Sequence, residues 1–250
     1  MQVKTIRAVS RAVDVLYSFL GPEKELGPSA IAERVGLDRA TVLRMLVTLE
    51  ERGLLNRNEG NQKYRLGPRV VELAGKFLET DDLAGLAYPE VRRLRDEYNE
   101  TVSIYIRDGT ERICIQRLES NHSLKRNVRL GQRLPLYAGA SAKVFLAFMP
   151  DEERTALVNS LPVPTGFRGE QLLVALPDIR QAGFAISLGE REEGIGAVAA
   201  PIFNRRGKVV AALSLSGPAA RLNREKLYSL GSAVREAAQR ISNLILDWSD

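Results

Sequence analysis

The feature that most constrains the fold of this chain is a tight turn between two amphipathic segments, within GPSAIAERVGLDRATVLRMLVTLEERG. Gly36 follows the first segment, at the point where a left-handed residue commonly ends a helix. Asp38 precedes the second segment and is a favourable helix N-cap. The second segment places its apolar residues on one helical stripe, which consists of Val42, Met45, Leu46 and Leu49. The spacing therefore predicts two helices joined by a short turn, as in a helix-turn-helix.

The outer face of the second helix carries side chains suited to DNA. Small, hydrogen-bonding and basic residues in its first turns are of the kind that reach base edges and phosphates, and we expect this role for Asp38, Arg39, Ala40, Thr41 and Arg44. The following segment, LLNRNEGNQKYRLG, predicts two short strands around EGNQ. This basic hairpin is typical of the wing of a winged helix, with Lys63, Tyr64 and Arg65 as expected DNA contacts. The alternative, a three-helix protein-interaction module, would present an acidic or apolar face instead.

Positive charge is concentrated around this motif. The chain carries a net charge of +5 and a pI of about 9.4, which favours a polyanionic partner. Residues 52–69 hold five basic residues against one acidic residue, and residues 1–11 hold three basic residues and no acidic one. Residues 6–20 predict a helix whose inward residues are Val9, Ala12, Val13, Leu16 and Leu20. Lys4, Arg7 and Arg11 are expected to add phosphate contacts.

Length and composition limit the remaining classes. A chain of 250 residues is enough for one large or two modest domains. It has no apolar run long enough to span a membrane and no signal-peptide pattern, so we expect no membrane partner. The single cysteine, Cys114, suggests a reducing cytoplasm. One cysteine and one histidine, His122, do not supply a structural zinc site, and we expect neither a metal nor a cofactor.

The second half of the chain alternates strand and helix patterns. The alternation around Ile104 and the Asp108-Gly109 pair predict a hairpin. Two further strands should meet at residues 204–207, and a long amphipathic helix should run from Arg224 to about Trp248. This order predicts a mainly antiparallel sheet with helices on both sides. A helix over QLLVALPDIRQAG is expected to be interrupted or restarted by Pro177, and the acidic run Glu190, Glu192 and Glu193 is expected to be a solvated loop.

Several motifs together resemble the IclR family of bacterial transcriptional regulators. They are GLDRATVLRMLVTLEERGLL, the wing ending in YRLG, GASAKVFLA, EEGIGAVAAPIF and AALSLSGPAAR. The resemblance implies an α+β chain with an N-terminal winged helix-turn-helix at 1–67, a linker helix at 68–82 and a GAF-like antiparallel-sheet effector domain at 83–250. It also implies a homodimer or tetramer that binds a pseudo-palindromic double-stranded DNA operator. Many members control the catabolism of organic acids or aromatic compounds.

The resemblance further implies an effector pocket between the sheet and the GASAK helix. Its residues, placed by motif position, are Leu134, Gly139, Ala140, Ser141, Ser187, Ile195, Ala197, Ser214 and Ser216. Free backbone N–H groups at a helix start suit a carboxylate. Ser214 and Ser216 are two apart on a predicted strand, so their hydroxyls should share one face, with Leu213 and Leu215 on the other. Buried hydroxyls need partners, although a solvent-facing strand would also explain the serines. Many relatives carry an acidic residue at the place of Ser187 and a cysteine at that of Ala197. Both departures leave the identity of the ligand open.

Two functions of different classes compete. The first is a ligand-responsive DNA-binding transcriptional regulator, of a catabolic operon, with a small organic acid or aromatic effector. The second is a small-molecule hydrolase or isomerase with a winged-helix dimerisation head. Against the second, Ser141 and Lys143 diverge by about 200° on a helix and do not share a proton. No other recognisable catalytic set is present in the sequence.

Overall fold

A computed structural model of the chain describes residues 5–80, 83–161 and 169–245. Its contacts divide the chain into two compact units, residues 1–80 and residues 81–250. We describe each unit by itself. No helix in the described ranges has the length and apolar character needed to cross a membrane.

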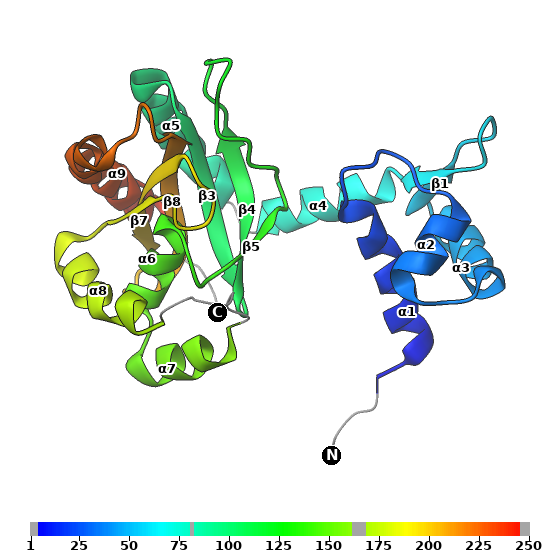
Figure 1. The fold of residues 1–250 in the computed structure, drawn as a ribbon. Helices are drawn as coiled ribbons and strands as arrows, with labels where there is room; N and C mark the ends of the chain where they lie inside the picture. Colours follow the sequence, from blue (N-terminus) through cyan, green and yellow to red (C-terminus); the bar gives the residue numbers. More distant parts are fainter. Residues whose placement is uncertain (1–4, 81–82, 162–168, 246–250) are drawn as a thin grey trace. The chain divides into compact units, whose positions relative to one another are not determined.

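The N-terminal unit contains four helices and a two-stranded hairpin within its described residues. Its elements are α1 (Arg7–Tyr17), a 3₁₀ turn (Ser18–Leu20), α2 (Pro28–Val35), α3 (Arg39–Glu51), β1 (Leu55–Arg57), β2 (Tyr64–Leu66) and α4 (Arg69–Thr80) (Figure 1). The turn between α2 and α3 has the expected geometry, because Gly36 is left-handed with φ 64° and the side chain of Asp38 caps α3. The hairpin is antiparallel, with Leu55 opposite Leu66. The sequence prediction of helix, turn, helix and wing is confirmed.

The predicted inward face of α1 is partly wrong. Val9 and Leu20 are 58% and 61% exposed, whereas Val15 and Phe19 are buried at 0% and 8% exposure. The chain changes at Ser18 from α-helical to 3₁₀ geometry, which turns successive residues by about 120° rather than 100°. The helical spacing therefore no longer holds for the last residues, and Phe19 instead of Leu20 reaches the core.

The C-terminal unit is built on a six-stranded antiparallel sheet in the order β5-β4-β3-β8-β7-β6. Its strands are β3 (Thr101–Asp108), β4 (Glu111–Leu118), β5 (Arg133–Pro135), β6 (Ala185–Leu188), β7 (Ile195–Phe203) and β8 (Val209–Pro218). Its helices are α5 (Leu83–Tyr98), α6 (Ala140–Phe148), α7 (Asp151–Ser160), α8 (Gly169–Ala182) and α9 (Arg224–Leu244).

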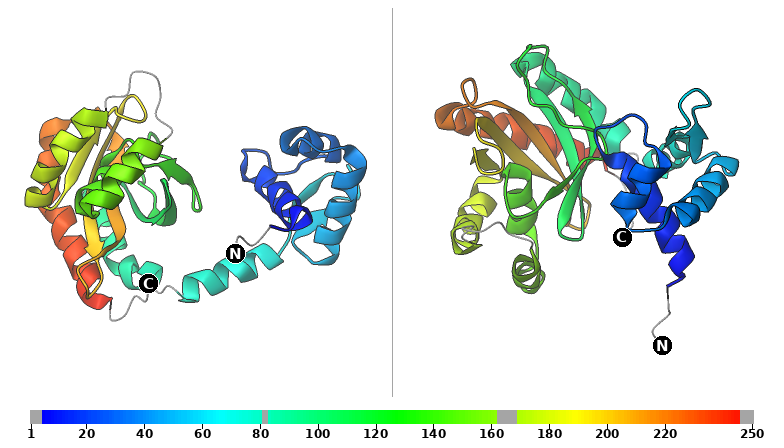
Figure 2. Two further views of the ribbon diagram at one scale, coloured as in Figure 1. Left: turned by 90° about the horizontal axis from the view of Figure 1, so that it is seen from below. Right: turned by 45° about the vertical axis from the view of Figure 1, so that its right-hand side comes forward.

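Helices cover both faces of this sheet, as predicted (Figures 1 and 2). One core joins α5 and α9 to one face, and a second core joins α6, α7 and α8 to the other. The two faces alternate along β8, so that Leu213 and Leu215 enter the first core while Ser214 and Ser216 face the other side. The fold therefore separates a predominantly apolar face from a face that also carries hydroxyl groups.

One helix differs from the sequence prediction, and a second helix also contains a proline. Helix α8 runs through Pro177 without a break, and α5 begins at Leu83 and runs through Pro89. A proline removes one backbone hydrogen bond, but the burial of Leu176 and Ile179 in α8, and of Val91 in α5, favours a continuous helix. Helix α9 ends at Leu244, and the predicted end near Trp248 lies outside the described residues.

Candidate functional sites

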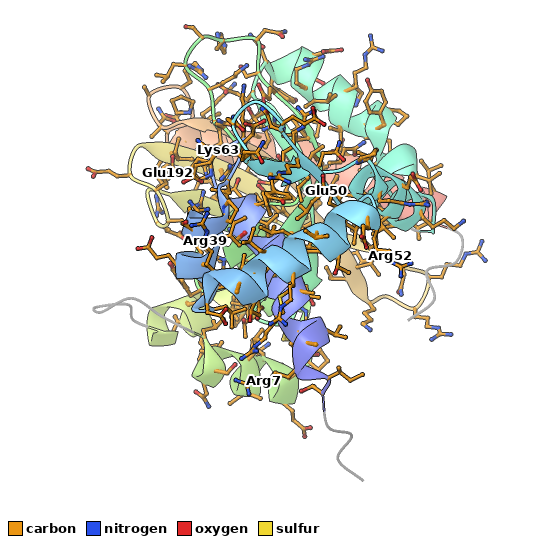
Figure 3. The ribbon with its side chains drawn as sticks, turned by 90° about the vertical axis from the view of Figure 1, so that its right-hand side faces the viewer. Arg7, Arg39, Glu50, Arg52, Lys63 and Glu192 are labelled. Atoms are coloured by element: carbon orange, nitrogen blue, oxygen red, sulfur yellow. The ribbon has the colours of Figure 1, made fainter. Side chains whose placement is uncertain are left out.

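The start of α3 presents the residues expected to contact DNA. Asp38, Arg39, Ala40 and Arg44 are exposed and Thr41 is half-buried. Figure 3 looks onto the outer side of α3, between Arg39 and Arg52. A carboxylate oxygen of Asp38 accepts a hydrogen bond from the backbone N–H of Thr41 at 2.8 Å, and this bond holds the pKa of Asp38 below its usual value. Asp38 therefore orders the first turn of the helix, on which Arg39 and Arg44 are exposed basic residues.

Helix α1 adds basic residues beside α3. Residues of both helices line one hollow of about 570 Å³, with Arg7 and Arg11 on α1 and Thr41 and Arg44 on α3. The Arg44 guanidinium donates to the Thr41 hydroxyl at 3.2 Å, which orients it toward the start of α3. The predicted residues of the two helices are thus brought together on one surface. Lys4 lies outside the described residues.

The wing exposes Lys63 and Arg65 but not Tyr64. The backbone of Tyr64 exchanges hydrogen bonds with Leu26 at 2.8 and 2.9 Å, which pins this residue at the edge of the unit. Because side chains alternate along a strand, Tyr64 points into the core when its neighbours point outward, and it is only 1% exposed. The prediction of a side-chain contact between Tyr64 and DNA is therefore wrong. Leu55 and Tyr64, one on each strand of the hairpin, are both buried in the core of this unit, and their apolar character was a signal that the sequence contained.

A single carboxylate holds the tip of the wing. Glu25 accepts hydrogen bonds from the side-chain amides of Asn61, at 2.9 Å, and Asn58, at 3.1 Å. These bonds hold the pKa of Glu25 below its usual value. The wing is thereby anchored to the segment before α2, and its basic residues have a defined position.

All nine residues predicted for an effector pocket border one cavity of the C-terminal unit, of about 50 Å³. The cavity lies between the sheet and the start of α6. Six further residues border it that sequence reasoning did not assign to the pocket, and these are Tyr105, Arg112, Arg126, Glu190, Arg191 and Glu192. Five of the six are arginines or glutamates, so the sequence prediction described the apolar and hydroxyl part of the lining and missed its charged part.

Hydroxyl groups form one part of this lining. Ser141, Ser187, Ser214 and Ser216 are between 4% and 6% exposed. Strand register explains why two of them lie on the same face of the sheet. Ser216 of β8 lies opposite Ala197 of β7, and Ala197 lies opposite Ser187 of β6. Residues directly opposite in neighbouring strands share a face. Within the described part of the chain, these four hydroxyls make no hydrogen bond to another protein group.

Arg112 supplies a buried positive charge to the cavity. It is 3% exposed, donates through one terminal nitrogen to the carbonyl of Pro135, and lies 5.7 Å above the Tyr105 ring. Its Nε has no partner within the described structure. Burial lowers the pKa of Arg112 to about 10 and raises that of Tyr105 to about 12. At neutral pH the guanidinium is therefore charged and the phenol neutral.

Gly139, at the start of α6, leaves space for the side chain of Arg112. Its φ is 99°, in the region that favours glycine, and a Cβ at this position would lie 2.9 Å from a terminal nitrogen of Arg112. The absence of a side chain lets the guanidinium lie against the helix N-terminus. Arg112 and the first backbone N–H groups of α6 thus form a local site for negative charge.

The acidic loop between β6 and β7 is not merely solvated. Glu190 accepts a hydrogen bond from the backbone N–H of Gly139 at 3.2 Å and forms an ion pair with Lys143. Glu192 pairs with Arg126, whose side chain is 8% exposed. Both interactions join residues about fifty or more positions apart, which sequence patterns do not reveal. The loop is exposed as expected, but two of its carboxylates also hold fixed ion pairs. The N–H of Gly139 is bonded to Glu190 and is not free as expected.

An exposed helix-turn-helix with a basic wing, together with a separate unit that encloses a charged cavity, defines the class of ligand-responsive transcriptional regulators. The comparisons with known proteins agree. The model "IclR helix-turn-helix domain" matches residues 8–59, and the model "Bacterial transcriptional regulator IclR C-terminal" matches residues 75–243. The chain belongs to the IclR family.

Relatives cover almost the whole chain. HTH-type transcriptional regulator KipR of Bacillus subtilis is 32% identical over 244 residues, with 96% of this chain and 97% of the relative covered. HTH-type transcriptional regulator KdgR of Escherichia coli is 30% identical over 246 residues, with 96% and 93% covered. The structure of an IclR regulator from Alicyclobacillus acidocaldarius matches with a TM-score of 0.83 and 26% identity, covering 96% of this chain and 99% of that one.

A ligand-bound relative is also similar. An IclR homologue from Microbacterium hydrocarbonoxydans, solved with 4-hydroxybenzoate, matches with a TM-score of 0.82 and 26% identity, covering 94% of this chain and 98% of that one. The family and its ligand-bound member show that this chain is a ligand-responsive transcriptional regulator. They overturn the alternative of a hydrolase or isomerase, because the relatives are named as regulators. In the described residues, no group of three or more potential ligating side chains gathers to hold a metal ion.

Proposed function

We propose that this regulator reads a pseudo-palindromic operator as a homo-oligomer and responds to a small organic acid bound beside Arg112, in control of a catabolic operon. The observation that carries the effector half is the buried Arg112 guanidinium. It borders a cavity, has no carboxylate partner within the described residues, and is charged at neutral pH. A buried charge without a counter-charge is costly, and a bound carboxylate would compensate it.

In the DNA half of the proposal, α3 lies in the major groove with Arg39, Thr41 and Arg44 nearest the bases. The exposure of Arg39 and Arg44, with Thr41 half-buried between them, supports this placement. Lys63 and Arg65 of the wing contact the backbone or the minor groove. Arg7 and Arg11 of α1, with Lys4 ahead of them, add phosphate contacts, so that affinity should fall steeply with salt.

A second copy of the chain is proposed to cover the apolar side chains of α4. Val71, Leu73 and Phe77 are 72%, 64% and 47% exposed, and apolar surface of this kind on a helix is typical of an oligomer interface. Pairing through α4 would present two reading heads to the two half-sites of an operator. Ligand binding would act by shifting the population of arrangements of these heads.

The first experiment is fluorescence anisotropy of the full chain on the DNA upstream of its own gene, against scrambled DNA, over a salt series. Selective binding that weakens steeply with salt is expected. Sedimentation equilibrium of the same samples, with Phe77→Glu beside wild type, tests the oligomer. A Phe77→Glu variant that stays as oligomeric as wild type would refute the α4 interface.

The effector half is tested in the same assay by adding small carboxylic acids to the operator complex. A change in operator affinity is expected for wild type and not for Arg112→Met. An equal response of both proteins would refute the role of Arg112.

A further inference from the structure

We propose that the effector is a short aliphatic monocarboxylate that also carries a hydroxyl or oxo group, rather than an aromatic acid or a dicarboxylate. This inference rests on the proposed effector site and narrows the chemistry of its ligand. Three properties of the cavity support it: its size, its charge balance and its hydroxyl groups.

Size argues against an aromatic ring. The cavity has a volume of about 50 Å³, whereas an apolar cavity of about 150 Å³ is known to hold benzene. Apolar surroundings for a ring are also scarce, because serines and charged residues make up more than half of the lining residues. Either kind of ligand needs the cavity to widen, and a three-carbon acid needs less widening than benzoate, which is larger than benzene.

Charge balance argues for one carboxylate. Of the two most buried cations, Arg126 is paired with Glu192, while Arg112 has no carboxylate partner in the described structure. The other charged residues of the lining also have ion-pair partners. Glu190 pairs with Lys143, and Arg191 approaches Glu192 at 3.3 Å. Glu190 and Glu192 border the same cavity and would repel a second carboxylate on the ligand.

The hydroxyls argue for a further oxygen on the ligand. The four serines lie within the lining and are nearly buried, yet they bond to no protein group within the described residues. Buried polar groups are almost always hydrogen-bonded. A ligand hydroxyl or oxo group next to the carboxylate would serve Ser214 and Ser216, while a plain alkyl chain would leave them without a partner.

The test is isothermal titration calorimetry of the full chain with matched acids. Lactate and pyruvate represent the proposed class, propionate lacks the extra oxygen, malonate adds a second carboxylate, and benzoate and 4-hydroxybenzoate add a ring. We expect lactate or pyruvate to bind about tenfold or more tightly than each of the other acids. In Ser214→Ala, the preference for lactate over propionate should shrink by about tenfold.

A change of charge should change the preference. Glu192→Gln removes the partner of Arg126 and leaves a second buried cation at the cavity. We expect this variant to bind malonate about tenfold more tightly than wild type does. Glu193→Gln is the matched control, because Glu193 is an exposed neighbour in the same loop that does not border the cavity. It should leave malonate binding unchanged.

The outcomes separate the inference from the function on which it rests. Benzoate, 4-hydroxybenzoate or malonate binding to wild type as tightly as lactate, and weakening in Arg112→Met, would overturn the ligand class but leave the effector site standing. If no acid of the panel binds wild type, or if Arg112→Met binds all of them normally, both the inference and the proposed acid site are wrong. Unchanged malonate binding in a folded Glu192→Gln variant would overturn the charge argument alone and with it the preference for monocarboxylates.

Discussion

The two units of this chain place arginine in opposite environments. In the N-terminal unit, Arg39, Arg44 and Arg65 are exposed on α3 and the wing, while Arg112 and Arg126 of the C-terminal unit are only 3% and 7% exposed. Exposed charges are screened by salt, and each contributes little. Buried charges are screened far less and require a specific partner. The comparison indicates that the N-terminal unit is suited to a polyanion through many weak contacts, and the C-terminal unit to a small anion through one strong contact.

The largest expected effect concerns Tyr64, which belongs neither to the DNA-binding surface nor to the cavity of the C-terminal unit. Tyr64→Ala should destabilise the N-terminal unit by about 3–5 kcal/mol, because it leaves a void in a small core, and operator binding should be lost with it. Tyr64→Phe keeps the ring and should bind the operator as wild type does. Urea unfolding and anisotropy measure both effects. Weaker operator binding by a stable Tyr64→Phe would mean that the hydroxyl reaches DNA after all.

Ser214→Leu should abolish the ligand response, with a loss of about a hundredfold or more in effector affinity, because the larger side chain fills the cavity. Operator affinity without effector should stay intact. Calorimetry and anisotropy on the same sample check the two statements. Ser229→Leu, on the exposed side of α9, is the control and should respond normally. A normal response in Ser214→Leu would move the effector site elsewhere.

Arg44→Ala should weaken operator binding by about 1–3 kcal/mol and relax selectivity, if this side chain reads a base. Anisotropy on operator and scrambled DNA gives both quantities. Arg52→Ala, at the far end of α3, provides the comparison and should lose less. Equal weakening on both DNAs would instead make Arg44 a phosphate contact.

The smallest expected effect is on the salt dependence of the wing. Lys63→Ala should lower the slope of log affinity against log salt by about 1, with a similar loss on every DNA sequence. Effector affinity in the C-terminal unit should depend much less on salt, because its arginines are buried. The opposite outcome, a wing variant with an unchanged slope, would remove Lys63 from the contacts and weaken the contrast between the units.

Local patterns in the sequence were sufficient for most of the fold. The turn at Gly36, the cap at Asp38 and the alternation of Leu213 to Ser216 each follow from interactions within a few residues, and each is found as predicted. The nine lining residues that came from resemblance to a family also meet at one cavity. The failure at Phe19 arose because 3₁₀ geometry changed which residue of α1 and its following turn faces inward. The failure at Tyr64 arose because side chains alternate along a strand that the bridge to Leu26 holds against the core.

The sequence by itself therefore determined the order of the elements, the winged helix-turn-helix and the hydroxyl face of β8, because periodicity and capping act over short distances along the chain. Only the tertiary structure decided the charge of the cavity. Arg112 meets the N-terminus of α6, and Glu192 meets Arg126 across 66 positions. Such pairings depend on how strands and loops pack in space. The burial of each charged group then sets the strength of its electrostatic interactions.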